Sequence, residues 1–146
     1  MTFRSPANRL FLDTSYIQAI LNPRDSNHPR ALSLIPRVER SPEVVITEAV
    51  LAEVGNALSG TPRLRRNAAA FIRGCYAEPN ISVIAVDTTL LTRALDLFER
   101  RTDKEWGLTD CISFVVMRDR GLHDAATEDR HFQQAGFRAL MADPEP

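Results

Sequence analysis

Cysteine is scarce in this chain, which has only Cys75 and Cys111. Neither stands in a CxxC pair or in the Cys/His spacing of a zinc site, so the sequence offers no redox motif, zinc centre or disulfide framework. Both lie in apolar stretches that read as helix. We therefore expect two buried thiols that pack as small hydrophobic side chains.

Long apolar runs and a strong net charge are also missing. No run approaches the roughly 20 residues of a membrane span, and Asp13 interrupts the stretch where a signal peptide would have its apolar core. The formal net charge is −1, so no general basic field points to nucleic acid, and such a partner would have to be held by a local patch. We expect a cytoplasmic protein without membrane contact.

The phosphate-binding loops GxxxxGK[ST] and GxGxxG are absent, which disfavours nucleotide-binding enzymes. Neither internal repeats nor low-complexity linkers occur. The chain has 146 residues, of which 44% are hydrophobic and 25% charged, an ordinary composition for a soluble globular protein. One domain spanning residues 1–146 is the simplest prediction.

What the sequence does contain is an alternation of short apolar strands and helices. Strands are predicted at 10–12, 44–46 and 81–86, helices at 14–21, 28–40, 47–58, 61–76, 87–98 and 109–117, and further short segments at 124–127 and 137–141. We expect Pro36 to kink the second helix and Thr109 to cap the last. Alternating strands and helices predict an α/β protein with a parallel sheet covered on both faces. Ligands of such sheets bind outside the carboxyl ends of the strands.

Four acidic residues stand near such strand ends. Asp13 follows the first strand, Glu53 lies two turns into the helix after the second, Asp110 opens the apolar helix, and Asp129 follows segment 124–127. Taken singly, each has an ordinary explanation. The aspartates can be caps or turn residues, and Glu53 can be a boundary residue at the edge of its helix's apolar face.

Taken together, the four carboxylates suggest a cation. Two carboxylates about 4 Å apart repel by roughly 4 kcal/mol at an effective dielectric constant of 20. A protein holds such a cluster only with protons or a cation. Oxygen ligands without a Cys/His set match Mg²⁺ or Mn²⁺.

Four stretches carry a family resemblance: FLDTSYIQAIL, VVITEAVLAEVGNAL, DKEWGLTDCISFVVM and ATEDRHFQQAGF. In this order and spacing, along nearly the whole chain, they resemble the PIN-domain nucleases, and among them the VapC-type toxins of prokaryotic toxin–antitoxin pairs. The resemblance implies a three-layer α/β/α sandwich with a central parallel sheet. It also implies one acidic pocket formed by Asp13, Glu53, Asp110 and Asp129, with Mg²⁺ or Mn²⁺ bound directly by Asp13 and Asp110.

The same resemblance implies hydrolysis of an RNA phosphodiester by metal-activated water, with Ser15 supporting the site. It further implies an antitoxin partner and a homodimer. Glu128 stands where the family usually has a non-acidic residue, and we favour its neighbour Asp129 for the pocket. For His131, contact with phosphate or simple packing is favoured over a role as proton donor.

A basic stretch is the candidate for RNA binding. Arg63, Arg65, Arg66 and Arg73 lie in a segment without acidic residues, and Arg100, Arg101 and Lys104 precede Asp110. A patch of this kind fits an RNA backbone, but it equally fits a solvated helix face.

Other families with an aspartate after the first strand fit less well. A haloacid-dehalogenase-type phosphatase needs a second acid where Ser15 stands, and a response-regulator receiver needs an acidic pair near Asp13. A PIN-like domain that binds RNA or protein without cutting is the remaining alternative. Acids at all four positions weigh against it.

Overall fold

The fold is an α/β sandwich around a five-stranded parallel sheet. The computed structural model describes residues 8–143. The strands are β1 (Leu10–Leu12), β2 (Val44–Thr47), β3 (Ile81–Ile84), β4 (Asp124–Ala126) and β5 (Arg138–Ala139). They are ordered β3-β2-β1-β4-β5, and every neighbouring pair is parallel.

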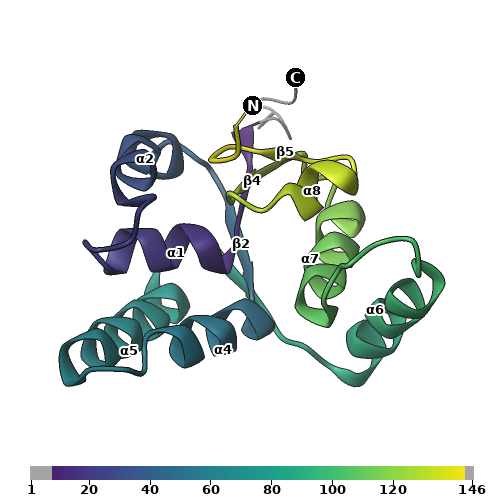
Figure 1. Cartoon of the computed structure of the whole chain (residues 1–146), viewed down its shortest axis with the longest axis horizontal. Helices are drawn as coiled ribbons and strands as arrows, with labels where there is room; N and C mark the ends of the chain where they lie inside the picture. The colour runs from purple at the N-terminus through teal and green to yellow at the C-terminus, as the bar shows by residue number, and fades with distance from the viewer. Residues whose placement is uncertain (1–7, 144–146) are drawn as a thin grey trace.

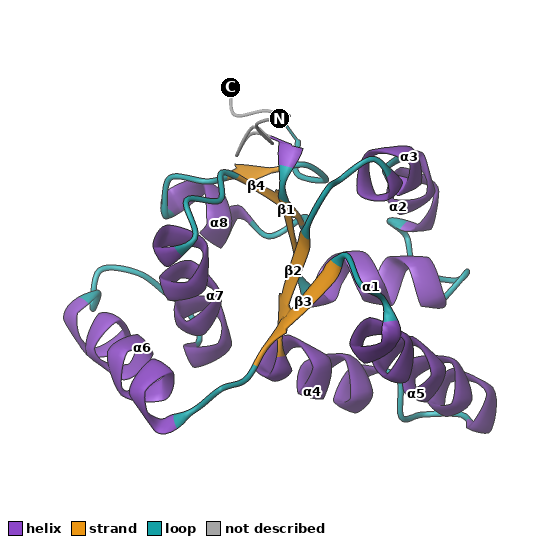
Figure 2. Cartoon of the chain, turned by 180° about the vertical axis from the view of Figure 1, so that it is seen from behind, coloured by secondary structure: helices purple, strands orange, loops and turns teal. Residues whose placement is uncertain are grey.

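Helices cover both faces of the sheet. They are α1 (Thr14–Leu21), α2 (His28–Ser33), α3 (Ile35–Glu39), α4 (Glu48–Ala57), α5 (Pro62–Ala77), α6 (Thr88–Arg100), α7 (Leu108–Asp119) and α8 (Arg130–Gln134). Helices α1, α2, α4 and α5 lie on one side, and α6, α7 and α8 on the other (Figure 1). Figure 2 shows the same three layers from behind, with α3 beside α2. The predicted fold class is confirmed. The described residues share one sheet, and a single domain over 1–146 stays a prediction.

The central strands are apolar because both of their faces are covered. Every residue of β1 and β2 is buried, which gives the continuous apolar runs seen in the sequence. On the α7/α8 side, the ring of Phe114 packs edge-on against Phe132, with centroids 5.0 Å apart, and Phe132 lies 6.1 Å from Phe11 of β1. This aromatic cluster fixes α7 and α8 against the central strand.

Three helices begin at a residue whose side chain caps them. Thr47 starts α4 by accepting the Val50 N–H at 3.1 Å, and Thr61 and Asp87 start α5 and α6 in the same way. The predicted cap at Thr109 is wrong, because α7 begins at Leu108 and its N-cap is Gly107, two residues before Thr109.

The second predicted helix and the third predicted strand also differ from the prediction. The expected helix at 28–40 is two short helices, because Pro36 has no N–H to donate and its ring crowds the preceding turn. The break falls at Leu34, between α2 and α3. Strand β3 ends at Ile84 rather than at residue 86.

The cysteine prediction is confirmed, since Cys75 and Cys111 are both buried and free. Within residues 8–143, we find no helix with the length and apolar character needed to cross a membrane.

Candidate active site

Asp13 occupies the carboxyl end of β1, where the chain turns into α1. Its side chain is only 6% exposed. The Oδ2 atom accepts a hydrogen bond from the Thr127 hydroxyl at 2.7 Å and a longer one from the Ser15 hydroxyl at 3.3 Å. Burial raises the pKa of Asp13 to about 6, and the nearby charges of Asp110 and Asp129 push it in the same direction. The fold thus holds a carboxylate where ionisation is costly.

Asp110 approaches the same site from the first turn of α7. Its Oδ2 accepts the Gly107 N–H at 3.2 Å and lies 2.9 Å from His131 Nδ1. Burial raises the pKa of Asp110, the hydrogen bond with His131 opposes this, and the charge of Asp129 adds to it. The capping role considered for Asp110 and its place in an acidic cluster therefore coexist, because one oxygen closes the helix end.

Asp129 joins this group as the N-cap of α8. Its Oδ1 accepts the His131 N–H at 2.9 Å and lies 3.4 Å from His131 Nδ1. Potential ligand atoms of Asp110, Asp129 and His131 all lie within 4.8 Å of one another. His131 therefore belongs to the acidic cluster through its ring, a contact that the sequence interpretation did not foresee.

Glu53 faces the site from α4, which lies on the opposite side of β1 from α7 and α8. Its Oε1 accepts a 2.6 Å hydrogen bond from the hydroxyl of Thr14, the first residue of α1. The side chain is half-buried, in agreement with the predicted position at the edge of the apolar face.

Each of the four acids is held through one oxygen. The side-chain hydrogen bonds described above go to Oδ2 of Asp13, Oε1 of Glu53, Oδ2 of Asp110 and Oδ1 of Asp129. The second oxygen of each accepts no side-chain hydrogen bond from the described residues. Each carboxylate is thus oriented by the protein, and Asp13 also accepts a hydrogen bond from the Thr14 backbone.

All four acids line one pocket of about 710 Å³. The other lining residues are Thr14, Ser15, Gln18, Glu128, Arg130, His131 and Gln134. The structure therefore brings together every predicted acid and Ser15, while their catalytic roles stay predictions.

Glu128 lies at the rim of this acidic pocket. Its side chain is exposed and accepts a hydrogen bond from Asn27 Nδ2, while its backbone N–H donates to Ser15 Oγ at 3.1 Å. Asp129, not Glu128, joins Asp110 and His131 in the close cluster. The geometry favours Asp129, as expected from the sequence.

Thr127 is the main residue that sequence reasoning missed. It is fully buried immediately after β4, bonds Asp13, lies 3.1 Å from Ser15 Oγ, and accepts the Asp129 N–H at 3.0 Å. One hydroxyl thus links three site residues. Its position after a strand was the available signal, but only carboxylates were followed from strand to strand.

The predicted RNA-binding arginines do not line the acidic pocket. Arg63, Arg65 and Arg66 are exposed in the first turns of α5. Arg65 and Arg66 line a separate pocket with Gly55 and Ile72. A role for these arginines in RNA binding stays a prediction.

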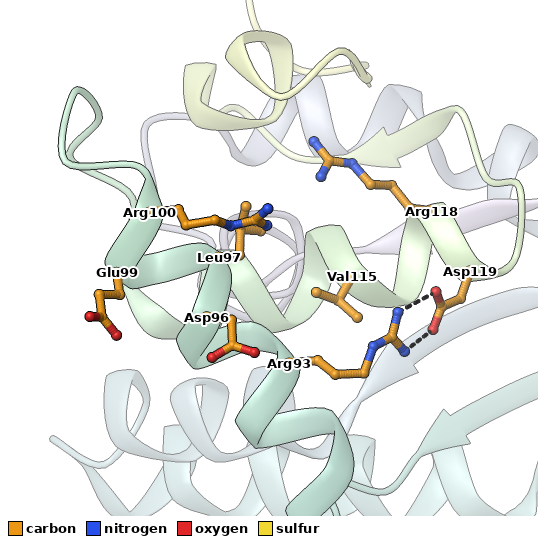
Figure 3. A pocket seen from close by; sticks show the side chains of 8 residues that line it. All are labelled: Arg93, Asp96, Leu97, Glu99, Arg100, Val115, Arg118 and Asp119. Carbon is orange, nitrogen blue, oxygen red and sulfur yellow. Dashed lines mark hydrogen bonds and ion pairs between the residues drawn. The ribbon is translucent and has the colours of Figure 1, made fainter.

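A second hollow of similar size, about 730 Å³, lies between α6 and α7 (Figure 3). Here Arg93 binds both carboxylate oxygens of Asp119, at 2.6 and 2.8 Å. An acid neutralised in this way does not need a metal. Within residues 8–143, the only group of three potential ligands is the one around Asp110.

The donor set of the acidic pocket suits a hard divalent cation. Four carboxylates supply oxygen ligands, and desolvation keeps the pKa values of Asp13 and Asp110 raised. A bound cation would offset the cost of ionising both groups. The imidazole of His131 is compatible with Mn²⁺ as well as with support of Asp110 from outside the coordination sphere.

Comparison with known proteins decides the family, because the PIN domain family profile matches residues 10–138. The chain belongs to the PIN domain family. A curated relative, the 23S rRNA-specific endonuclease VapC20 of Mycobacterium tuberculosis, is 30% identical over 128 residues, which are 88% of this chain and 95% of the relative. The predicted resemblance to VapC-type PIN nucleases is confirmed.

Solved PIN-domain structures agree with this assignment. The crystal structure of M. tuberculosis VapC20, described as a sarcin-ricin loop cleaving toxin, has a TM-score of 0.78 and 29% identity, and the match covers 88% of this chain and 96% of that one. VapBC2 from Rickettsia felis, bound to a promoter DNA fragment, has a TM-score of 0.60 and 14% identity, covering 87% and 92%. FitAcB from Neisseria gonorrhoeae has a TM-score of 0.61 and 16% identity, and the match covers 89% of this chain and 94% of that one. The last two show the fold alone.

Proposed function

We propose that this PIN domain is a metal-dependent ribonuclease, the toxin of a VapC-type toxin–antitoxin pair, and that its substrate is large-subunit ribosomal RNA. The observation that carries the proposal is the acidic pocket, in which four carboxylates are each oriented by hydrogen bonds from neighbouring residues. The choice of ribosomal RNA rests on the relative named a 23S rRNA-specific endonuclease.

In this proposal Asp13 and Asp110 would hold Mg²⁺ or Mn²⁺ directly, and Glu53 and Asp129 would act directly or through water. A cation bound there would lower the pKa of water and neutralise charge on the phosphate. The chain's own part is orientation. Ser15 and Thr127 hold Asp13, while Gly107 and His131 hold Asp110. Hydrolysis then needs no side-chain nucleophile.

The partners belong to the proposal as well. We propose an antitoxin that covers the toxin, a homodimer, a cytoplasmic location where RNA is accessible, and RNA contacts by Arg63, Arg65 and Arg66. For the homodimer, α6 offers apolar side chains at helical spacing that are nearly half-exposed: Leu91 41%, Leu95 48% and Phe98 46%.

Cleavage of purified large-subunit ribosomal RNA with Mn²⁺ or Mg²⁺ tests the function. We expect Asp13→Asn to lose at least 100-fold in rate, because a neutral amide is a poor ligand for a hard cation. Asp87→Asn is the matched control, since Asp87 also follows a strand but only caps α6, and asparagine caps equally well. Equal cleavage by wild type and Asp13→Asn would refute the proposed site. RNA binding without cleavage by wild type would favour the non-cleaving alternative.

A further inference from the structure

Arg130 is the only arginine or lysine among the residues that line the acidic pocket. It is the first residue of α8 and stands between two members of the close cluster, Asp129 and His131. Its side chain is exposed. The turn that brings Asp129 and His131 to Asp110 therefore also delivers a guanidinium to the pocket.

This guanidinium is unpaired although acids surround it. Five carboxylates line the pocket, those of Asp13, Glu53, Asp110, Glu128 and Asp129. Arg130 forms no side-chain hydrogen bond or ion pair with any residue in the described range 8–143. Arg93 behaves differently, because it meets a single neighbouring carboxylate, Asp119, with both of its terminal nitrogens (Figure 3).

The hydrogen bonds of the acids show that Arg130 is not needed to orient them. Oδ1 of Asp129 is held by the His131 N–H, and Oδ2 of Asp110 by Gly107 and the His131 ring. The side chain of Glu128 binds Asn27. These acids are thus oriented by other donors, and no bond to a neighbour restrains the planar donor fork of Arg130.

An RNA phosphodiester entering this pocket needs such a donor. The phosphate carries a negative charge, and one divalent cation does not neutralise five carboxylates. Arginine binds two phosphate oxygens at once, which orients the group as well as attracting it. We infer that Arg130 clamps the substrate phosphate at the mouth of the pocket and so positions it against the carboxylate cluster. This inference rests on the proposed ribonuclease function.

Replacement of Arg130 tests the inference in two assays, cleavage and binding. In steady-state cleavage of purified large-subunit ribosomal RNA with Mn²⁺, we expect Arg130→Ala to lower kcat/KM about 10- to 100-fold, the range for a hydrogen bond to a charged group. Arg130→Lys keeps the charge but not the fork, and should fall between alanine and wild type. The second assay measures equilibrium binding of the same RNA without divalent metal. The slope of log K against the logarithm of salt concentration should be smaller in magnitude by about one in Arg130→Ala than in wild type.

Arg118→Ala is the matched control. Arg118 is also exposed, lies near the end of α7 in the hollow of Figure 3, and has no ion pair within the described residues. We expect kcat/KM within twofold of wild type. Calorimetric titration with Mn²⁺ alone should show no loss of affinity in Arg130→Ala, which separates a phosphate contact from damage to the acidic cluster.

The outcomes separate this inference from the proposed function. Wild-type kcat/KM and an unchanged salt dependence in Arg130→Ala would overturn the phosphate clamp while leaving the nuclease intact. Loss of Mn²⁺ affinity in Arg130→Ala would also overturn it, by showing that the residue supports the cluster. If wild type binds RNA without cutting it and Arg130→Ala binds with a smaller salt dependence, the clamp stands and the nuclease function fails. Absence of RNA binding by wild type would overturn both.

Discussion

The hydroxyl of Thr127 donates a 2.7 Å hydrogen bond to Oδ2 of Asp13, joining the ends of two neighbouring strands that are 114 residues apart in the chain. The bond is buried and helps to keep the Asp13 carboxylate ionisable despite desolvation. It exists because β1 and β4 are parallel neighbours, with Leu12 paired to Ala126.

Thr127→Val should therefore damage both stability and cleavage. Valine has the shape of threonine but leaves the buried Asp13 carboxylate without its main donor, at a cost of about 1–3 kcal/mol. We expect a lower melting temperature above pH 6 and at least a tenfold slower cleavage of RNA. Thr127→Ser, which retains the hydroxyl, is the control and should stay near wild type. A Val variant as active as the Ser variant would contradict this role.

Asp13→Asn should stabilise the metal-free protein at neutral pH while abolishing cleavage. The pKa of Asp13 is raised from 3.8 to about 6, so the folded state binds this proton more tightly than the unfolded state does. Its contribution to stability is therefore best below pH 3.8 and declines as pH rises through 6, by up to about 3 kcal/mol. Urea unfolding of both proteins in EDTA from pH 4.5 to 8 measures the difference. A gap between the two that does not grow with pH would contradict the assignment.

Metal affinity should fall as the pH is lowered through about 6, because the raised pKa of Asp13 makes the cation compete with a proton. The raised pKa of Asp110 acts in the same direction. Titration calorimetry with Mn²⁺ at pH 5.5, 6.5 and 7.5 should show weakening at the lowest pH and proton release on binding. Affinity that is independent of pH would show that neither carboxylate is a ligand.

His131 should matter through the position of Asp110. His131→Ala removes the ring that lies 2.9 Å from Asp110 Oδ2, and we expect Mn²⁺ affinity to fall about 10- to 100-fold. His131→Asn places an amide donor near the Nδ1 position and should recover part of the loss. If the ring nitrogen is itself a ligand, asparagine should not rescue. Circular dichroism checks that both variants fold.

The exposed side chains of α6 predict a homodimer that a charge disrupts. Leu95→Glu places a carboxylate in the middle of the row Leu91, Leu95 and Phe98. We expect the chain to sediment as a dimer and this variant as a monomer in analytical ultracentrifugation. Leu32→Glu alters a similarly exposed leucine on α2 and is the control. A monomeric wild type would remove the homodimer from the proposal.

Much of the fold was predictable because its signals are local. The run Leu10–Leu12 and the run Val44–Thr47 are buried on both faces, and threonine or aspartate caps mark α4, α5 and α6. Predicted helix boundaries were wrong where the sequence offered more than one candidate capping residue. Gly107 caps α7 without a side chain, so the neighbouring Thr109 was the stronger sequence signal.

The acids of the site were also predictable, since three aspartates follow strands or open a helix, Glu53 lies two turns into the helix after β2, and together they match a known family pattern. Their supporting bonds were not. The pairs Thr127–Asp13 and His131–Asp110 depend on strand order and on the angle between α7 and α8, which one sequence does not encode locally. These hydrogen bonds form only in the folded protein, where segments far apart in the sequence lie side by side.

The aromatic cluster of Phe11, Phe114 and Phe132 links the acidic pocket to the hydrophobic core, so the geometry of the pocket depends on core packing. Phe11 precedes Asp13 by two residues, Phe114 follows Asp110 by four, and Phe132 follows Asp129 by three. Phe132 packs against both Phe11 and Phe114. The three acids, which lie on three different elements, therefore depend on one aromatic cluster. Trimming the central ring, as in Phe132→Leu, would loosen all three carboxylates together before the sheet melts. If the proposed ribonuclease function holds, such a variant should cleave RNA at low temperature and lose cleavage at a temperature where its secondary structure is still intact.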